Sequence, residues 1–228
     1  MPSSYMLYLL GFVIVMMAQM SVQGAYQKYK KIANRKGYTG AQVAREILNR
    51  NGLSSIGVEV ASGGVLSDHY DPTHHVVRLS PDIYYNQSIA SISVAAHEVG
   101  HALQHKENYG WISLRNRILP YANIASNLGW VVLFLGLFLF GGTDNIVFQL
   151  GFIMLVIIVI FQLVTLPIEL NSSSRALKQL TGNGYIYEEE AEQCRSMLKA
   201  AAFTYIAALI NSILQILRVL LMTRRNDD

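Results

Sequence analysis

The chain has 228 residues, of which 52% are hydrophobic and only 14% are charged. A soluble domain carries about 25% charged residues, so this composition excludes a disordered chain or a coiled coil and disfavours a soluble enzyme. A single cysteine, Cys194, excludes an intrachain disulfide, and we expect it to be structural. The net charge of +3 is small and the basic residues are scattered, so we expect no nucleic-acid partner.

Four apolar stretches are long enough for transmembrane helices, which need about 20 residues to cross the hydrocarbon core. They lie at residues 5–20, 121–140, 146–167 and 200–222. The first has no basic residues before it and only a weak cleavage site, which favours a retained anchor over a signal peptide. Asn211, Gln215 and Arg218 interrupt the fourth, so a buried amphipathic helix is the alternative to a span there.

Lys and Arg residues are distributed unevenly along the chain. None lies in residues 1–24 or in the turn at 141–145. Eleven of the 18 lie in residues 24–120, and four more lie in residues 168–199. By the positive-inside rule, these last two segments are cytoplasmic, and the N-terminus and the turn lie outside.

The segment between the first two spans has the pattern of a small α+β unit. Thr39 can cap a helix in which AQVAREILNR carries apolar residues at helical spacing. Residues 58–60 and 75–80 are strand-like and predict two strands. A second helix follows, capped by Asn86 or Ser88, and it runs through SIASISVAAHEVGHALQH.

This second helix contains an H-E-x-x-H pentad at residues 97–101. Positions i and i+4 share a helix face, so His97 and His101 can both bind one Zn²⁺ at about 2.0–2.1 Å. Glu98 is offset by about 100° and can reach a zinc-bound water without binding the metal, as a general base does. Gly100 costs about 1 kcal/mol relative to alanine inside a helix, which predicts a steric reason for it. The alternative interpretation is two structural histidines with an incidental glutamate.

A hydrolytic zinc site needs a third protein ligand and an open fourth position. Glu169 ends the third span at the predicted cytoplasmic face, where a carboxylate needs a partner such as a cation. His105 lies on the same helix face as His101 but one turn farther along. Glu190 or Glu192, in the run EEEAE, is the remaining candidate, although such a run is more often a solvated helix start.

Other residues can serve the site from farther away. Asn171 and Ser172 lie close enough to Glu169 to hydrogen-bond a ligand. Arg175, one to two turns past that glutamate, can stabilise an oxyanion or clamp a carboxylate. His74 and His75 lie at or just before the second predicted strand, which makes them further oxyanion candidates. We expect that strand, at residues 75–80, to bind an extended peptide by strand addition.

Three segments, LSDHYDPTHHVVRLSPDIY, IASISVAAHEVGHALQH and LVTLPIELNSSSRAL, together resemble the YugP-like membrane-associated neutral zinc metallopeptidases of bacteria. The resemblance covers nearly the whole chain, including the order of the spans. It implies a zinc endopeptidase with about four spans and a site that faces the cytoplasm. It also implies that His97, His101 and Glu169 bind one zinc ion. Glu98 is then the base.

The chain is more distantly similar to the integral-membrane zincins that include HtpX and the CAAX prenyl proteases. Those proteins carry Asp four residues after the ligand glutamate, where this chain has Ser173. Many YugP-like chains carry Asp two residues after the glutamate, where this chain has Asn171. These departures concern the groups that support the ligands rather than the three ligands themselves.

We predict a mainly α integral membrane protein with about four transmembrane helices and a small cytoplasmic α+β, zincin-like unit that carries the HEVGH helix. The predicted division is a transmembrane anchor at 1–23, the zincin-like unit at 24–120, a two-helix transmembrane hairpin at 121–168, a cytoplasmic helical segment with the third ligand at 169–199, and a C-terminal transmembrane helix and tail at 200–228. Four spans put the C-terminus outside, whereas Arg224 and Arg225 favour the inside, so the topology of this end stays open.

The predicted function is that of a membrane-embedded, zinc-dependent metalloendopeptidase of the bacterial plasma membrane, with its active site facing the cytoplasm. Its partners are the lipid bilayer and a peptide or membrane-protein substrate. The alternative is a catalytically idle zinc-binding scaffold or adaptor, which would have a fourth protein ligand such as His105 or Glu107. A transporter or channel is a weaker alternative, because the chain has only four spans and few intramembrane charges.

Overall fold

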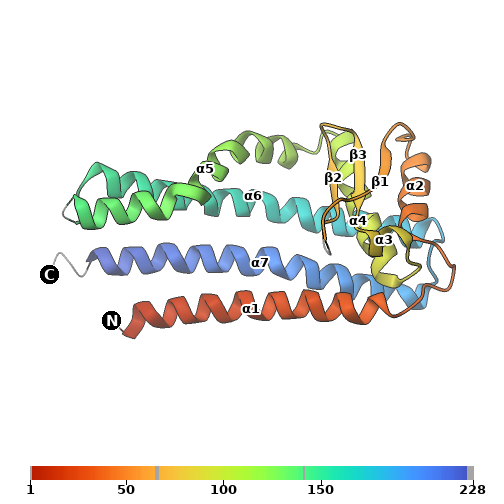
Figure 1. The fold of residues 1–228 in the computed structure, drawn as a ribbon, viewed down its shortest axis with the longest axis horizontal. Coiled ribbons are helices and arrows are strands. Elements are labelled where there is room, and N and C mark those ends of the chain that lie inside the picture. The colour runs from red at the N-terminus through yellow and green to blue at the C-terminus, as the bar shows by residue number, and fades with distance from the viewer. Residues whose placement is uncertain (1, 65–66, 141, 225–228) are drawn as a thin grey trace. The chain divides into compact units, whose positions relative to one another are not determined.

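The computed structural model describes residues 2–64, 67–140 and 142–224 of the chain, and Figure 1 labels its elements. Arg225, which bears on the predicted topology, lies outside the described residues. In chain order the elements are α1 (Pro2–Lys30), α2 (Gly40–Arg50), β1 (Gly57–Val60), β2 (His69–Asp71), β3 (Val76–Leu79), α3 (Pro81–Tyr85), α4 (Ile89–Lys106), α5 (Gly110–Leu139), α6 (Ile146–Gly182) and α7 (Glu188–Arg224).

The chain forms two compact units. Unit 1 comprises Met1–Gln19, Gly110–Pro167 and Thr204–Asp228. Unit 2 comprises Met20–Tyr109 and Ile168–Phe203. Unit 2 therefore contains the pentad, all three strands and the part of α6 that carries Glu169.

Four helices among the described residues are long and apolar enough to cross a membrane, namely α1, α5, α6 and α7. This finding agrees with the predicted number of spans. The helices run beyond the apolar stretches that predicted them. α6 has 37 residues and is about 55 Å long at 1.5 Å per residue, whereas the hydrocarbon core is only about 30 Å thick. Glu169 lies on the part of α6 that continues past the apolar stretch.

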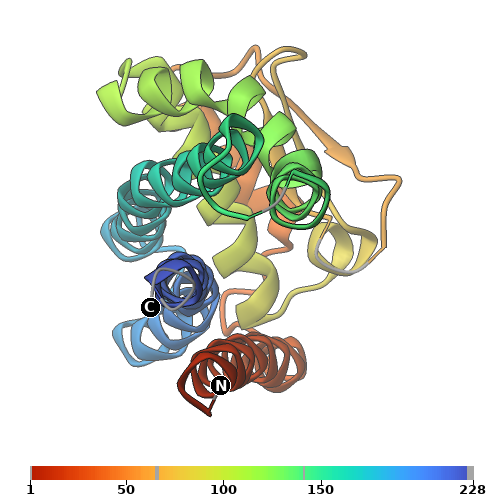
Figure 2. The ribbon, with the colours of Figure 1, turned by 90° about the vertical axis from the view of Figure 1, so that its left-hand side faces the viewer.

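In unit 1 the second half of α5 lies beside α6, and α1 lies beside α7 (Figures 1 and 2). The backbones of α5 and α6 approach closely at two glycines. A Cβ on Gly136 would overlap the backbone nitrogen of Phe148, and one on Gly151 would overlap that of Leu133. Asn145 caps α6 by accepting a hydrogen bond from the Phe148 N–H, and it donates to the Gly136 carbonyl. The two helices thus form a tightly packed hairpin.

The sheet of unit 2 has the strand order β1-β3-β2. β1 pairs with β3 in parallel, with Val58 opposite Val77, and β2 pairs with β3 antiparallel, with Tyr70 opposite the same valine. β1 and β3 confirm the strands predicted at residues 58–60 and 75–80, whereas β2 is not among the predicted strands. The expectation that a peptide adds to residues 75–80 is wrong, because β3 is the central strand and both of its edges are paired.

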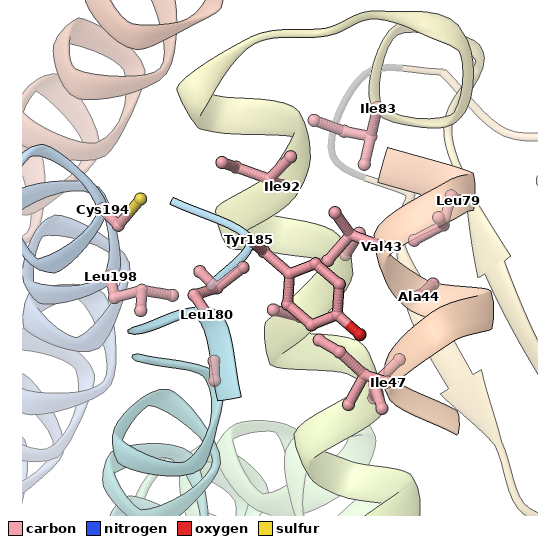
Figure 3. Close-up of a cluster of buried hydrophobic side chains, with 14 of the residues drawn as sticks. Val43, Ala44, Ile47, Leu79, Ile83, Ile92, Leu180, Tyr185, Cys194 and Leu198 are labelled. Carbon is pink, nitrogen blue, oxygen red and sulfur yellow. The ribbon is translucent and has the colours of Figure 1, made fainter. Parts of the chain in front are cut away.

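Helix α4 runs through the core of unit 2. Figure 3 shows Val43 and Ile47 of α2 on one side of α4, and Cys194 and Leu198 of α7 on the other. α2 begins at a capping box in which Thr39 accepts a hydrogen bond from the third residue of the helix. Cys194 is completely buried among these apolar side chains, as expected for a residue with a structural role. A helix that is buried on most of its surface is a rigid support for the residues it carries.

Candidate metal centre

Helix α4 places His97 and His101 on one face. Ser88 caps the start of the helix, because its Oγ accepts a hydrogen bond from the Ser91 N–H at 3.1 Å, and the helix continues without a break through the pentad. Residues four apart in a helix lie one above the other. The two imidazole rings accordingly have centroids 4.8 Å apart, with their planes at 86°.

Glu169 of α6 joins the two imidazoles to make what we call the metal group, which consists of His97, His101 and Glu169. Glu169 Oε2 lies 3.3 Å from His97 Nε2 and 3.5 Å from His101 Nε2. All three donor atoms lie within 4.8 Å of one another. Ligand atoms about 2.0–2.1 Å from a tetrahedral zinc ion lie about 3.4 Å from each other. The donor types and their spacing therefore fit a zinc ion.

The metal group is largely shielded from water. The side chain of Glu169 is 8% exposed, and those of His97 and His101 are 14% and 19% exposed. A carboxylate this buried needs a cationic partner, because desolvation of an isolated charge is very costly. Burial by itself lowers the pKa of His101, but the hydrogen bond to Glu169 and the negative charges of Glu98 and Glu169 outweigh burial and raise it. The electrostatic environment thus favours a cation at this position.

Gly100 explains how α6 comes close enough to the histidines. A Cβ on Gly100 would overlap Ser172 Oγ and would lie 2.8 Å from the Ser172 carbonyl oxygen. Ser172 Oγ also donates a hydrogen bond to the His97 carbonyl at 2.7 Å. The two helix backbones are therefore in contact, which brings Glu169 to the histidines. This contact confirms the steric reason that the sequence predicts for Gly100.

Each imidazole has a second polar neighbour at its Nδ1 atom. His101 Nδ1 lies 3.0 Å from Gln104 Oε1, and His97 Nδ1 lies 3.2 Å from Ser173 Oγ. A histidine that binds a metal usually donates its other ring N–H to such a partner, which fixes the orientation of the ring. In both rings it is therefore Nε2 that faces Glu169.

Glu98 is buried, and strand β2 holds its carboxylate. Glu98 Oε2 accepts a hydrogen bond from the Tyr70 N–H at 3.1 Å. Asp68, just before β2, lies near the same carboxylate. Burial raises the pKa of Asp68, and the negative charge of Glu98 raises it further. The outer strand of the sheet thus fixes the predicted base through a backbone group.

Asn171 and Arg175 lie on α6 beyond Glu169 and contact each other. Arg175 Nε donates to Asn171 Oδ1 at 2.7 Å. The two terminal nitrogens of Arg175 pair with the carboxylate of Glu107 at 2.8 and 2.7 Å, and this lowers the pKa of Glu107. The guanidinium is thus engaged at the C-terminal end of α4, and its predicted role in oxyanion binding stays a prediction.

His74 and His75 lie in the connection between β2 and β3. His74 Nδ1 lies 2.6 Å from Asp71 Oδ2. His75 has a left-handed φ of 51°, and its ring stacks on that of His105 with centroids 6.2 Å apart. Neither histidine belongs to the metal group as found among the described residues. Their predicted contribution to an oxyanion site stays a prediction.

The alternative third ligands have other partners. His105 Nδ1 lies 2.9 Å from Tyr70 Oη. Glu190 accepts hydrogen bonds from two backbone N–H groups and caps α7, and Glu192 forms an ion pair within α7. Glu169 is therefore the acidic side chain that the structure brings to the two histidines.

Three contributions to the site are missing from the sequence-based prediction, namely Gln104, Ser173 as a partner of a ring nitrogen, and the backbone N–H of Tyr70. Gln104 is completely buried in α4. Its one signal in the sequence is the spacing of three residues from His101, which places both on the same helix face. The other two contributions depend on contacts between distant segments and give no local signal.

The fold and the site define a class: a mainly helical protein whose described residues include four helices apolar enough to cross a membrane, and in which the two histidines of an H-E-x-x-H helix meet a glutamate of another helix. Two histidines and one glutamate are the ligand set of many zinc peptidases. Residues 4–224 match the family described as "putative neutral zinc metallopeptidase". The chain belongs to this family. It is 47% identical over 211 residues to the "putative membrane protease YugP" of Bacillus subtilis (strain 168), and the match covers 92% of each chain. No solved structure matches the chain.

Proposed function

We propose that this protein is a membrane-embedded zinc metalloendopeptidase in which the metal group holds one zinc ion and Glu98 is the general base. One observation carries the proposal. The Glu169 oxygen lies 3.3 and 3.5 Å from the two imidazole nitrogens, which is a spacing suited to zinc. Glu98 lies on α4, the helix that also carries the two histidines. Membership of a zinc metallopeptidase family supports the same activity.

Glu98 is the side chain that transfers protons in the proposed reaction. A bound zinc ion would supply a water molecule with a pKa near 7 and would polarise the scissile carbonyl group. Glu98 accepts the proton that the attacking water loses, and it later gives that proton to the nitrogen of the leaving amine. The hydrogen bond from the Tyr70 N–H holds the carboxylate in place during both transfers.

The outer edge of β2 supports the binding of an extended peptide. β2 lies at the edge of the sheet, and its Tyr70 N–H faces Glu98. Glu98 already accepts from the Tyr70 N–H, so a peptide at this edge would pair with the remaining backbone groups of β2 and would lie beside the general base. Edge strands bind peptides in this way in several protein classes, with main-chain hydrogen bonds that tolerate many sequences.

We also propose that the site faces the cytoplasm of a bacterial cell, at the surface of its plasma membrane. The distribution of Lys and Arg supports this orientation, since eleven of the 18 lie in residues 24–120. Glu169 follows the apolar stretch of α6 directly, which supports a site close to the membrane surface. Segments of membrane proteins, as well as peptides, are then suitable substrates.

A zinc-binding scaffold without activity would require a closed site with a fourth protein ligand. The two residues considered for that position have other partners. His105 Nδ1 contacts Tyr70 Oη, and the Glu107 carboxylate pairs with Arg175. Among the residues that the structure describes, the metal group has three donors, which favours the open site of a hydrolytic enzyme.

The proposal is tested with the wild type, Glu98→Gln and Glu169→Ala, each purified in detergent. The wild type should hold one zinc ion per chain and cleave casein or itself. Glu98→Gln should keep its zinc and lose about 10²–10⁴-fold of the cleavage rate, because glutamine cannot take the proton. Glu169→Ala should lose both zinc and activity. Metal analysis and a cleavage assay on the same preparations give the two readouts.

Glu192→Gln is a matched control for these substitutions. Glu192 is exposed and pairs with Arg195 one turn along α7, so its loss should leave zinc content and cleavage unchanged. Full zinc content in Glu169→Ala would exclude Glu169 as a ligand. Wild-type cleavage by Glu98→Gln would exclude Glu98 as the base.

A further inference from the structure

We propose that Gln104 is a positioning residue for the metal group. It holds His101 in the tautomer that binds zinc through Nε2, and it links this ring to the backbone beside Glu169. The inference rests on the proposed function, because it assumes that zinc binds at the metal group.

The orientation of the Gln104 amide follows from its partners. Gln104 Nε2 lies 2.8 Å from the Ile168 carbonyl oxygen, which can only accept a hydrogen bond. The amide nitrogen therefore donates to Ile168, and the amide oxygen faces His101 Nδ1 at 3.0 Å. Because an amide oxygen can only accept, His101 Nδ1 must carry the hydrogen. In the neutral ring this leaves the lone pair on Nε2, the atom that faces Glu169.

The same side chain connects two ligands on different helices. Gln104 contacts the ring of His101 on one side and, on the other, the carbonyl of Ile168, the residue before Glu169. The side chain is fully buried, so water competes little for these hydrogen bonds. Ser172 Oγ makes a second link between the helices, in the opposite direction, to the α4 backbone. Glu169 thus lies between two hydrogen bonds that join α4 to α6.

Further residues hold the Gln104 amide in its orientation. Asn171 Oδ1 accepts from Gln104 Nε2 at 2.9 Å and from Arg175 Nε at 2.7 Å. Arg175 in turn forms its two-point ion pair with Glu107. A continuous chain of polar contacts therefore runs from this ion pair to His101.

The two histidines differ in the kind of partner at Nδ1. The partner of His97 is the hydroxyl of Ser173, which can donate or accept and therefore selects no tautomer. The amide oxygen of Gln104 does select one. We therefore expect loss of Gln104 to affect zinc binding more than loss of the Ser173 hydroxyl.

The test is Gln104→Leu, which keeps the approximate size of the side chain and removes its hydrogen bonds. Zinc affinity, measured by competition with a chromogenic chelator, should fall about 10–100-fold. The absorption spectrum of the cobalt(II)-substituted protein should also change, because the His101 ring is free to turn. Ser173→Ala should show a smaller loss of affinity.

A melting experiment separates positioning from general packing. Zinc that binds the folded state raises the melting temperature, and at a fixed zinc concentration the rise is larger for tighter binding. In Gln104→Leu, this zinc-dependent rise should shrink. A purely structural role would lower the melting temperatures with and without zinc by the same amount. Gln179→Leu is the matched control, because Gln179 accepts hydrogen bonds from Asn51 and Asn183 and from no member of the metal group.

Asn171 supplies an independent pair of variants. Asn171→Asp keeps an oxygen that accepts from Gln104 and Arg175, so its zinc affinity should stay close to that of the wild type. Asn171→Leu removes the acceptor and should weaken zinc binding in the same direction as Gln104→Leu. A Gln104→Leu protein with wild-type zinc affinity and cobalt spectrum would overturn the inference about Gln104 and would leave the proposed function standing. A wild type that binds no zinc would overturn the proposed function as well.

Discussion

Gly100 occupies the position in the pentad where α4 and α6 touch. Gly100→Ala should favour the helix by about 1 kcal/mol through propensity alone. We expect the opposite net effect, because the new Cβ would overlap Ser172 Oγ and lie 2.8 Å from the Ser172 carbonyl oxygen. Carbon contacts need about 3.5–4.0 Å, so α6 must shift and carry Glu169 away from the histidines. The measurement is zinc affinity together with melting temperature, and both should fall.

Gly24→Ala is the control for this prediction. Gly24 also lies inside a helix, α1, but a Cβ there would have nothing within 4 Å. This substitution should leave zinc affinity unchanged and leave stability equal or slightly higher. If Gly100→Ala binds zinc as tightly as the wild type, close approach of the two helices at Gly100 is not what places Glu169.

Asn171 shows how a departure from a family pattern is accommodated. The family resemblance implies Asp at this position, and the structure shows that Asn171 uses its side-chain oxygen to accept two hydrogen bonds. An aspartate oxygen can accept the same two bonds from Gln104 and Arg175. The difference in charge is therefore compatible with the same arrangement around His101.

At the scale of elements, local sequence determines some helix boundaries and not others. α2 and α4 begin where the sequence predicts, because Thr39 and Ser88 supply capping oxygens to the first turn. α6 begins at Ile146 as predicted but continues past Pro167 to Gly182. The apolar stretch predicts where lipid surrounds the helix, whereas the continuation is stabilised by packing within unit 2.

Strand β2 could not be predicted, because contacts between distant residues determine it. Its three residues contain no β-branched side chain, and the last of them is the Asp of an Asp-Pro pair, which predicts a turn. Arg78 of β3 donates to Asp71 Oδ2 at 2.7 Å, and Asp68 accepts from the Ser80 N–H at 2.7 Å. These contacts hold β2 against β3 and give no signal in a short sequence window.

The backbone contact between β2 and Glu98 leads to a prediction about this element. Tyr70→Pro removes the N–H that donates to Glu98, whereas Tyr70→Ala removes the side chain and keeps the N–H. Loss of a hydrogen bond to a charged group costs about 1.5–3 kcal/mol, so kcat of Tyr70→Pro should fall about 10–100-fold below that of Tyr70→Ala. Steady-state cleavage assays on both variants give the comparison.

Zinc content is the internal control for this pair, because the metal group lies on α4 and α6 and neither variant changes it. Both proteins should bind zinc as the wild type does. Equal kcat values in the two variants would show that the Tyr70 N–H does not support the base. Loss of zinc from Tyr70→Pro alone would show that β2 supports the fold around the metal group instead.

In the whole molecule, the metal group combines two histidines of one local sequence motif, the pentad, with Glu169, which lies 72 positions after His97. The pentad could be predicted with its geometry, because a helix fixes the spacing of its two histidines. The residues alone predict Glu169 only as one of several acidic or histidine candidates, since the choice depends on the contact between Gly100 and Ser172, and the family resemblance is what singles it out. Gln104 could not be predicted, because a buried glutamine resembles any polar helix residue in sequence.

The distribution of Lys and Arg predicts opposite sides of the membrane for the α5–α6 turn and the start of α7. Asp144 and Glu188 are exposed at these two places. A membrane-impermeant maleimide should label Asp144→Cys in intact cells and should label Glu188→Cys only after the membrane is disrupted. The native Cys194 is completely buried and should give little background, which the parent protein checks directly.

A reversed labelling pattern would contradict the cytoplasmic orientation and would place the start of α7 outside the cell. The proposed substrates would then be extracellular or at the outer surface of the membrane, although the chemistry of the metal group would be unchanged. Labelling of both positions in intact cells would show that α6 does not separate them by a membrane. In that case α6, which is about 55 Å long by its 37 residues, would have to lie along the membrane surface or outside it.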